Sequence, residues 1–135
     1  MKISLAISLA LAVVAGSALA AGSAIDLNLQ GGYANKNLRA CGSTNHYGFY
    51  QQRKRVDFRG TLVPAPASPR LVKVKIKKCV RGTFVRVKEL HVRVNSRGAY
   101  QGSFTVRAKG YYFARTYDYA ARPAAKSAKR HFRIR

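Results

Sequence analysis

The stretch Leu71-Val72-Lys73-Val74-Lys75-Ile76-Lys77 decides the fold of this chain. From Val72 onward apolar and basic side chains alternate along it, and a period of two places them on opposite faces of a β-strand. One face therefore belongs to a protein core, and the other face carries a row of lysines. The stretch predicts a half-buried strand that covers an apolar core.

The same alternation continues on both sides of this strand. Upstream, Val56, Phe58 and Leu62 alternate with polar residues until a proline-rich connection at 64–69, where the prolines lack the N–H that a sheet ladder needs. Downstream, the phase changes near residues 88–89, which indicates either two short strands or one kinked strand. A turn is expected at 95–98, with Gly98 supplying a positive φ. Further alternating stretches lie at 84–94, 100–106, 111–115 and 131–135.

Six or seven short strands, with no helix expected after residue 20, favour an all-β fold. Each sheet would have one apolar face to bury, so we predict a two-sheet antiparallel immunoglobulin-like sandwich over residues 52–135. A small closed barrel of the oligonucleotide-binding type is the alternative. Residues 21–51 are rich in Gly, Asn and Ser, and we expect an irregular lead-in with one short strand near 25–29. Its aromatic residues would either form a surface patch or pack onto the sandwich: Tyr33, Tyr47, Phe49 and Tyr50.

Residues 1–20, MKISLAISLALAVVAGSALA, have the three parts of a secretory signal peptide. Lys2 is the positive start, an apolar run follows, and Ala18-Leu19-Ala20 is the small-residue cleavage site. The run is shorter than the roughly 20 residues that a membrane-spanning helix needs. We therefore predict a cleaved helical signal peptide and a secreted or cell-surface protein, with no transmembrane segment in the mature chain.

Export also bears on Cys41 and Cys79, the only two cysteines of the chain. An oxidising compartment lets an even pair close, so we predict one disulfide that tethers the lead-in to the sandwich. The alternative is a nucleophilic or metal-binding thiol near His46, but the cysteines and scattered histidines match no zinc spacing. Strict alternation places Cys79 on the lysine side of its strand, so either the bridge crosses the outer face or Lys77-Lys78 contains a bulge.

Several short motifs after Gly60 occur in an order that is typical of known modules. The region resembles the immunoglobulin-like or prealbumin-like β-sandwich modules of secreted bacterial proteins, especially those of actinobacteria. The resemblance implies a binding or spacing role, no active site and no transferred functional residues. The motifs that carry it are Gly60-Thr61-Leu62, Val72-x-Val-x-Ile76, Asn95-Ser96-Arg97-Gly98-x-Tyr100-x-Gly102-x-Phe104, Tyr112-Phe113-Ala114-Arg115 and Phe132-x-Ile134.

The charge is the one functional clue in the composition. The 135 residues include 26 Lys and Arg against 4 Asp and Glu, a formal net charge of +22 that costs self-repulsion. We predict a basic sheet surface if the strands before and after 71–77 lie beside it. Its partner would be an anionic envelope polymer, an anionic membrane surface, extracellular nucleic acid or an acidic protein, with no small-molecule substrate and no cofactor. The candidate residues are Arg53, Lys54, Arg55, Arg59, Lys73, Lys75, Lys77, Arg86, Lys88 and Arg93.

Two other functions remain open at this stage. The first is a purely structural or adhesive cell-surface module, because alternating lysines also keep a strand soluble. The second is a small basic ribonuclease that would use Glu89, His91 and His46 with a basic phosphate-binding residue. Other catalytic classes lack their parts, because the chain has no Gly-x-Ser-x-Gly elbow, no phosphate-binding loop and no metal cluster. We therefore predict a non-catalytic protein.

Overall fold

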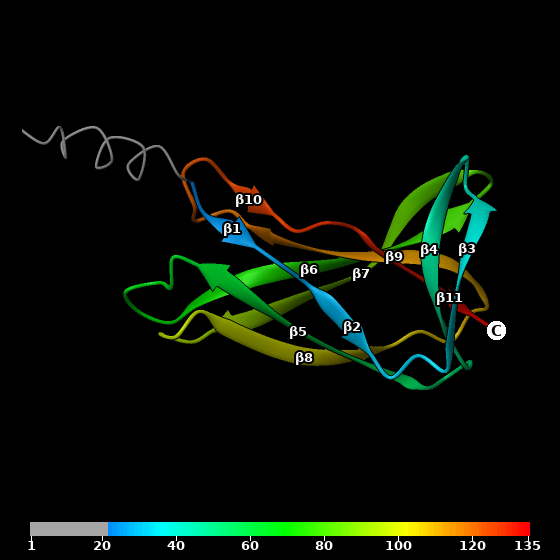
Figure 1. Cartoon of the computed structure of the whole chain (residues 1–135), viewed down its shortest axis with the longest axis horizontal. Coiled ribbons are helices and arrows are strands. Elements are labelled where there is room, and N and C mark those ends of the chain that lie inside the picture. The colour runs from blue at the N-terminus through cyan, green and yellow to red at the C-terminus, as the bar shows by residue number, and fades with distance from the viewer. Residues whose placement is uncertain (1–21) are drawn as a thin grey trace, which may run out of the picture.

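The computed structural model describes residues 22–135, which form β-strands joined by turns and loops (Figure 1). The predicted signal peptide lies outside these residues. Within the described part of the chain, no helix has the length and apolar character to cross a membrane. In chain order the strands are β1 (Ala24–Ile25), β2 (Asn28–Gln30), β3 (Ala34–Ala40), β4 (Ser43–Tyr50), β5 (Arg55–Val63), β6 (Arg70–Val80), β7 (Thr83–Val94), β8 (Ala99–Thr105), β9 (Gly110–Asp118), β10 (Ala125–Lys126) and β11 (Arg130–Ile134).

The strands form two sheets that pack face to face as a sandwich, which confirms the all-β, two-sheet prediction. In the 4-stranded sheet, β5 pairs with β8 on one side and with β1 and β2 on the other. The 7-stranded sheet has the order β3-β4-β11-β9-β6-β7, and β10 pairs with β9. The strand number is higher than the six or seven expected, because short and polar strands give little signal in the sequence.

The core lies between the two sheets and contains the residues that the alternation selects. From β6, Val72, Val74 and Ile76 are buried, as the pattern of 71–77 predicts. They pack in one cluster with side chains from the opposite sheet. Burying one such side chain is worth roughly 1.5–3 kcal/mol, so these alternating positions dominate the stability of the sandwich. The facing cluster includes Val56, Phe58, Leu62, Tyr100 and Phe104.

The C-terminal strand β11 lies inside the 7-stranded sheet, between β4 and β9. It pairs antiparallel with β9 and parallel with β4, in the register His131 to Tyr47 through Ile134 to Tyr50. The expectation of a purely antiparallel sandwich is therefore wrong at this one pair. Phe132 and Ile134 are buried in the core, as predicted, which explains why such a short strand can hold its place.

The N-terminal segment is not the irregular lead-in that its composition suggests. It contains β1 and β2 in one sheet, and β3 and β4 in the other. β3 could not be predicted from the sequence because most of its side chains are exposed and therefore show no apolar alternation. The strand is held by its pairing with β4. Of the four aromatic residues, Tyr47, Phe49 and Tyr50 are buried while Tyr33 is exposed.

The pairing of β6 with β7 resolves where Cys79 lies. Alternation continues along β6 through Lys77, and Cys79 falls on the outer face with the lysines. The register shift lies opposite Ile76 and Lys77, where β7 skips Val87 in the pairing. The phase change in the sequence near 88–89 is thus a β-bulge within one long strand, and the disulfide crosses the outer face.

The predicted disulfide joins Cys41 and Cys79, with a Cα–Cα distance of 5.8 Å. Cys41 lies in the β3–β4 turn, and Cys79 lies near the end of β6. Two strands separate β4 from β6, so a flat sheet would hold them about 14 Å apart at the usual strand spacing. The 7-stranded sheet must therefore curl toward its outer face, and Figure 1 shows the β3–β4 hairpin standing steeply across the ends of β6, β7 and β9.

The turn between β7 and β8 leads the chain from one sheet to the other. Asn95 accepts hydrogen bonds through Oδ1 from the N–H groups of Arg97 and Ala99, at 2.9 and 3.1 Å. Gly98 has φ 82°, which confirms the positive φ expected from the sequence. Its carbonyl accepts from the N–H of Leu62, which fixes the turn against β5.

Removing the disulfide should destabilise the protein substantially. The bridge closes a loop of 38 residues, and the chain-entropy relation gives about 4 kcal/mol for such a loop. We expect the double variant Cys41→Ser, Cys79→Ser to unfold at a lower urea concentration than the wild type, with a free energy of unfolding reduced by up to that amount. Equal stability of the oxidised and reduced proteins would contradict this account of the curled sheet.

Adding one methyl group at Gly60 should also be costly. The Tyr100 ring lies over Gly60, and the Tyr100 hydroxyl donates to the Asp26 carbonyl and contacts Thr116 Oγ1 at 2.8 Å. A side chain at this position would collide with both the ring and the Asp26 backbone. We expect Gly60→Ala to lower the free energy of unfolding by about 1–3 kcal/mol. Gly22→Ala, which meets no atom within 4 Å, is the matched control in the same urea titration.

Candidate functional site

The outer face of the 7-stranded sheet is the face that points away from the core, and we call it the lysine face. Lys73, Lys75 and Lys77 project from it because their neighbours on β6 are buried. Residues two apart in a strand lie about 7 Å from each other, so the three lysines leave the strand at even intervals. The flanking strands β7 and β9 add further cations to the same face, which makes the basic surface wider than β6 alone.

Register and ring contacts assign the remaining cations of this face. Arg86 and Arg93 lie opposite Lys77 and Leu71 on β7, and Arg115 lies opposite Lys75 on β9. Lys129 Nζ lies 5.0 Å from the centre of the Phe113 ring, which belongs to the same face. The lysine face therefore extends from β7 across β6 and β9 to the start of β11. Its other cations are Lys36, Lys126 and Arg133.

The predicted basic residues do not all gather on one surface. Lys73, Lys75, Lys77, Arg86 and Arg93 are brought together, because β7 lies beside β6. The strand before them, β5, belongs to the other sheet, so the expectation that it widens the same surface is wrong. The residues that the structure separates from the lysine face are Arg55 and Arg59 on the outer face of β5, Arg53 and Lys54 before β5, and Lys88, whose Nζ donates to the Thr105 carbonyl across the sheets.

Carboxylates do little to neutralise the lysine face. All four of them lie in the described residues, and only Glu89 is on this face, 3.4 Å from Arg86 and 3.5 Å from His91. Asp118 is fully buried and pairs with Arg70 at 2.5 Å. The remaining two carboxylates bind to residues of the other sheet: Asp57 pairs with Arg55, and Asp26 accepts a hydrogen bond from the Thr61 N–H. Most cations of the lysine face therefore have no carboxylate within the described chain to pair with.

Aromatic rings alternate with the cations at one end of the face. Tyr117 and Tyr119 stack with their centroids 5.7 Å apart, and Lys75 Nζ lies 4.8 Å from the Tyr117 centroid. Lys75 also donates to the Tyr119 hydroxyl at 2.7 Å, and this hydrogen bond raises the pKa of Lys75. Lys73 lies 5.4 Å from the Tyr119 ring. These contacts orient the ammonium groups of Lys73 and Lys75.

A second aromatic cluster lies where the sheet curls. Tyr47, Phe84, Phe113 and His131 point to the lysine face, yet Tyr47 is 0% and Phe113 is 3% exposed. Their ring centroids are 4.8 to 5.9 Å apart, as in the 4.8 Å contact between Phe84 and Phe113. The disulfide lies on this side of the sheet and holds the two hairpins over the cluster. The lysine face thus includes a small cluster of buried rings that is separate from the core between the two sheets.

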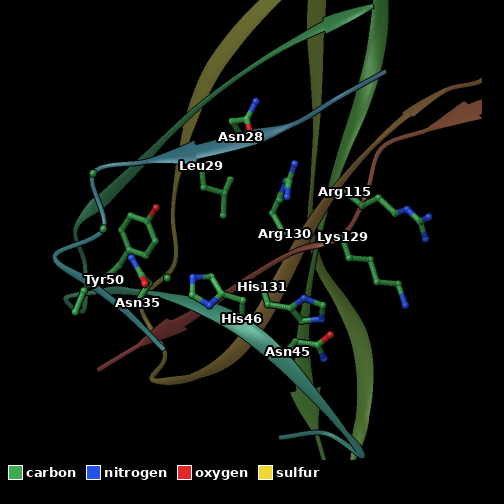
Figure 2. A pocket seen from close by; sticks show the side chains of 14 residues that line it. Asn28, Leu29, Asn35, Asn45, His46, Tyr50, Arg115, Lys129, Arg130 and His131 are labelled. Carbon is green, nitrogen blue, oxygen red and sulfur yellow. The ribbon is translucent and has the colours of Figure 1, made fainter. Parts of the chain in front are cut away.

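A cleft opens beside this cluster, with a volume of about 720 Å³. It exists because β11 pairs with only the second half of β4, so Ser43–His46 has β3 alone as a neighbour. Figure 2 shows Leu29 entering from β2, and His46, Asn45 and His131 lying close together. The lining includes Arg115, Lys129 and Arg130, and among the described residues that form it none carries a carboxylate.

Two guanidinium groups of the cleft are fixed by the backbone. Arg115 Nε donates to the Ser127 carbonyl at 2.7 Å, and Arg130 Nε donates to the Leu27 carbonyl at 2.6 Å, which bridges the two sheets. Because Nε makes these bonds, the terminal nitrogens of both groups are held in defined positions. His46 is oriented by a 2.9 Å contact of its Nδ1 with Asn37 Oδ1. The lining is therefore preorganised and positively charged.

The residues considered for ribonuclease chemistry are not brought into one site. Glu89 and His91 share the face of β7, as expected, but His46 is on β4 and lines the cleft. The pKa of Glu89 is lowered, with its hydrogen bond to His91 and the nearby charges of Lys73 and Arg86 opposing the effect of desolvation. A lowered pKa makes a carboxylate a weaker base. No group of three or more His, Cys, Asp or Glu gathers anywhere in residues 22–135.

Most residues of the cleft could not be found from the sequence, because they come from strands far apart in the chain. His131 and its basic neighbours were visible only as a run, Lys129-Arg130-His131, next to the predicted last strand. Nothing local indicates that this run meets Asn45 and His46. That meeting follows from the parallel pairing of β4 with β11.

The pH dependence of stability should report on His131. Burial, and to a smaller extent the charge of Lys129, lower its pKa below the usual value of 6.5. Below that value the unfolded chain binds the proton more readily than the folded protein does. The contribution of neutral His131 to the free energy of unfolding is therefore fully present above about pH 6.5 and is lost as the pH falls toward the lowered pKa. We expect melting temperature to fall from about pH 7.5 to 5.5. His131→Phe should reduce this fall, whereas the exposed control His91→Asn should keep it; an unchanged fall in His131→Phe would contradict the assignment.

The cleft and the lysine face share Arg115 and Lys129, so they form one continuous basic region on the 7-stranded sheet. The cations that the 7-stranded sheet presents in this region indicate which class of ligand it could bind. Neither a protein-family model nor a curated protein sequence matches the chain.

Proposed function

We propose that this protein is a secreted, non-catalytic module that binds an anionic polymer through the lysine face. The observation that carries the proposal is the asymmetry between the two outer faces. The lysine face bears cations on neighbouring strands with Glu89 as its one carboxylate, whereas Arg55 on the opposite face is paired with Asp57 at 3.0 Å. Solubility alone would be served by charges of both signs on both faces.

The physical basis of binding is the release of counterions. A polymer with repeated negative charges carries condensed cations, and each ammonium or guanidinium group that replaces one of them adds favourable entropy. Evenly spaced lysines on a rigid strand suit such a repeat, because their positions are fixed before the polymer arrives. Affinity of this kind falls steeply as salt is added, which gives it an experimental signature.

An extracellular location is part of the proposal. The disulfide supports it, because such bonds persist mainly in oxidising compartments. The polymer would be an anionic envelope polymer or an extracellular nucleic acid; an anionic membrane or an acidic protein would also present the required charge. A relationship to immunoglobulin-like or prealbumin-like modules is proposed as well, with the two-sheet sandwich as its support.

The two competing functions make different predictions. A purely structural module would bind polyanions no better than any protein of equal charge. A ribonuclease would degrade RNA and lose that activity in His91→Ala. Because Glu89 and His91 stand on an exposed strand with no further histidine beside them on β7, we do not favour catalysis.

Neutralising the lysine face should weaken polyanion binding selectively. We expect the triple variant Lys73→Gln, Lys75→Gln, Lys77→Gln to bind heparin or a long oligonucleotide at least about tenfold more weakly at moderate salt. The slope of log affinity against log salt concentration should fall by about 2–3, the contribution of three lost contacts. Fluorescence anisotropy over a salt series measures both quantities.

The control removes the same charge from elsewhere. The variant Lys54→Gln, Arg55→Gln, Arg59→Gln alters the β5 side of the sandwich and should keep most of the affinity and of the salt slope. Near-ultraviolet circular dichroism verifies that both variants fold. If the two triple variants lose affinity equally, the binding is a property of net charge, and the lysine face has no special role.

A further inference from the structure

We infer that the cleft beside the lysine face is a binding site for one acidic sugar unit of an anionic polysaccharide. The inference rests on the proposed function, because it identifies the polymer class that the same basic region would hold. It concerns a different feature, however: a cleft with a mixed polar lining, whereas the lysine face carries mainly charge.

The first step is the charge of the cleft. Arg115, Lys129 and Arg130 contribute three cations, and the described lining includes no carboxylate to balance them. The Nε atom of each arginine donates a hydrogen bond to a backbone carbonyl, and this bond fixes the position of the terminal nitrogens of the guanidinium group. A carboxylate, sulfate or phosphate group would find charge-assisted hydrogen-bond donors here without reorganisation.

The second step is the neutral part of the lining. Asn35 and Asn45 come from the β3–β4 hairpin, whereas the side chain of Asn28 leaves β2 on the side opposite to Leu29 and points away from the cleft (Figure 2). A carboxamide both donates and accepts, which matches a hydroxyl group, since a hydroxyl also does both. Two carboxamides and two imidazoles beside fixed cations therefore suit a ligand that carries several hydroxyls and one negative group. That combination describes an acidic sugar.

The third step distinguishes a sugar from a nucleobase. Proteins that hold single-stranded nucleic acid usually stack bases on open aromatic rings. Among the described residues lining the cleft, the one tyrosine or phenylalanine is Tyr50, and it is 3% exposed because its ring packs against Phe132. The stacked rings of the half-buried Tyr117 and the exposed Tyr119 lie outside this lining. The cleft thus offers hydrogen bonds and charge and lacks an exposed tyrosine or phenylalanine ring among its described residues.

Continuity with the lysine face explains how a polymer would use both features. Arg115 is opposite Lys75 in the sheet, and Lys129 covers Phe113, whose partner on β6 is Lys77. A chain with one unit in the cleft could therefore continue along β6. The cleft would select the sugar, and the lysines would add affinity for each further charged unit.

The experiment uses short probes that fill the cleft but reach little of the lysine face. Binding of a galacturonic acid trisaccharide, the neutral galactose trisaccharide and a single-stranded trinucleotide is measured by calorimetry at about 0.15 M salt, with the wild-type mature protein. We expect the acidic trisaccharide to bind at least about tenfold more tightly than either other probe. Equal binding of the neutral trisaccharide, or tighter binding of the trinucleotide, would overturn the inference.

Isosteric variants then locate the site. Asn35→Asp and Asn45→Asp each place a negative charge in the cleft, and each should weaken the acidic trisaccharide by about tenfold or more. Gln101→Glu makes the same chemical change on β8, outside the cleft lining, and should alter binding less than about twofold. If all three variants behave alike, the cleft is not the site.

The two proposals can fail separately. Loss of long-polymer binding in the β6 triple-glutamine variant, with the trisaccharide still bound, would support both. Trisaccharide binding without any salt-dependent binding of long polyanions would retain the cleft and reject the lysine face. Salt-dependent polymer binding with no trisaccharide binding would retain the lysine face and reject the cleft.

Discussion

The insertion of β11 between β4 and β9 is the constraint on which the rest of the 7-stranded sheet depends. Without this strand, the β3–β4 hairpin would have no strand to pair with, and Lys36 on β3 would be separated from the lysines of β6. Phe132 and Ile134 secure the strand from the core side, while His131 joins the aromatic cluster on the other side. The five residues of β11 therefore stabilise the sandwich and position the curl, and two of them, Arg130 and His131, line the cleft.

Charge and packing are separated cleanly by the alternation of β6. Its even-numbered residues from 72 to 76 are in the core, and its odd-numbered lysines are outside. Aromatic rings beneath and beside the lysines, such as Tyr117 and Phe113, give their aliphatic stems an apolar surface to lie on. The positive surface is thus built onto a stable sheet, and its cations are held in place by local contacts instead of by carboxylates.

The sequence predicts those parts of the fold whose signal is local. Alternation in 71–77 identifies a strand and its two faces, two cysteines together with a predicted signal peptide indicate the disulfide, and Asn95 with Gly98 identifies a turn. It fails where stability comes from pairing with distant residues. The exposed side chains of β3 carry no apolar pattern, and nothing near residue 47 indicates that residue 131 will lie beside it. For the same reason, Lys73, Lys75 and Lys77 could be assigned to one face, whereas the sheet that holds Arg55 and Arg59 could not be foreseen.

The central place of the last strand also affects the order in which the molecule can form. A chain emerges from the ribosome with residues 130–134 far behind β4, yet β4 reaches β9 only through them. Pairing across so large a sequence separation is slow, because the long intervening loop must close before the contact forms. The 7-stranded sheet therefore cannot close until residues 130–134 have left the ribosome, and until then the β3–β4 hairpin has no strand to join.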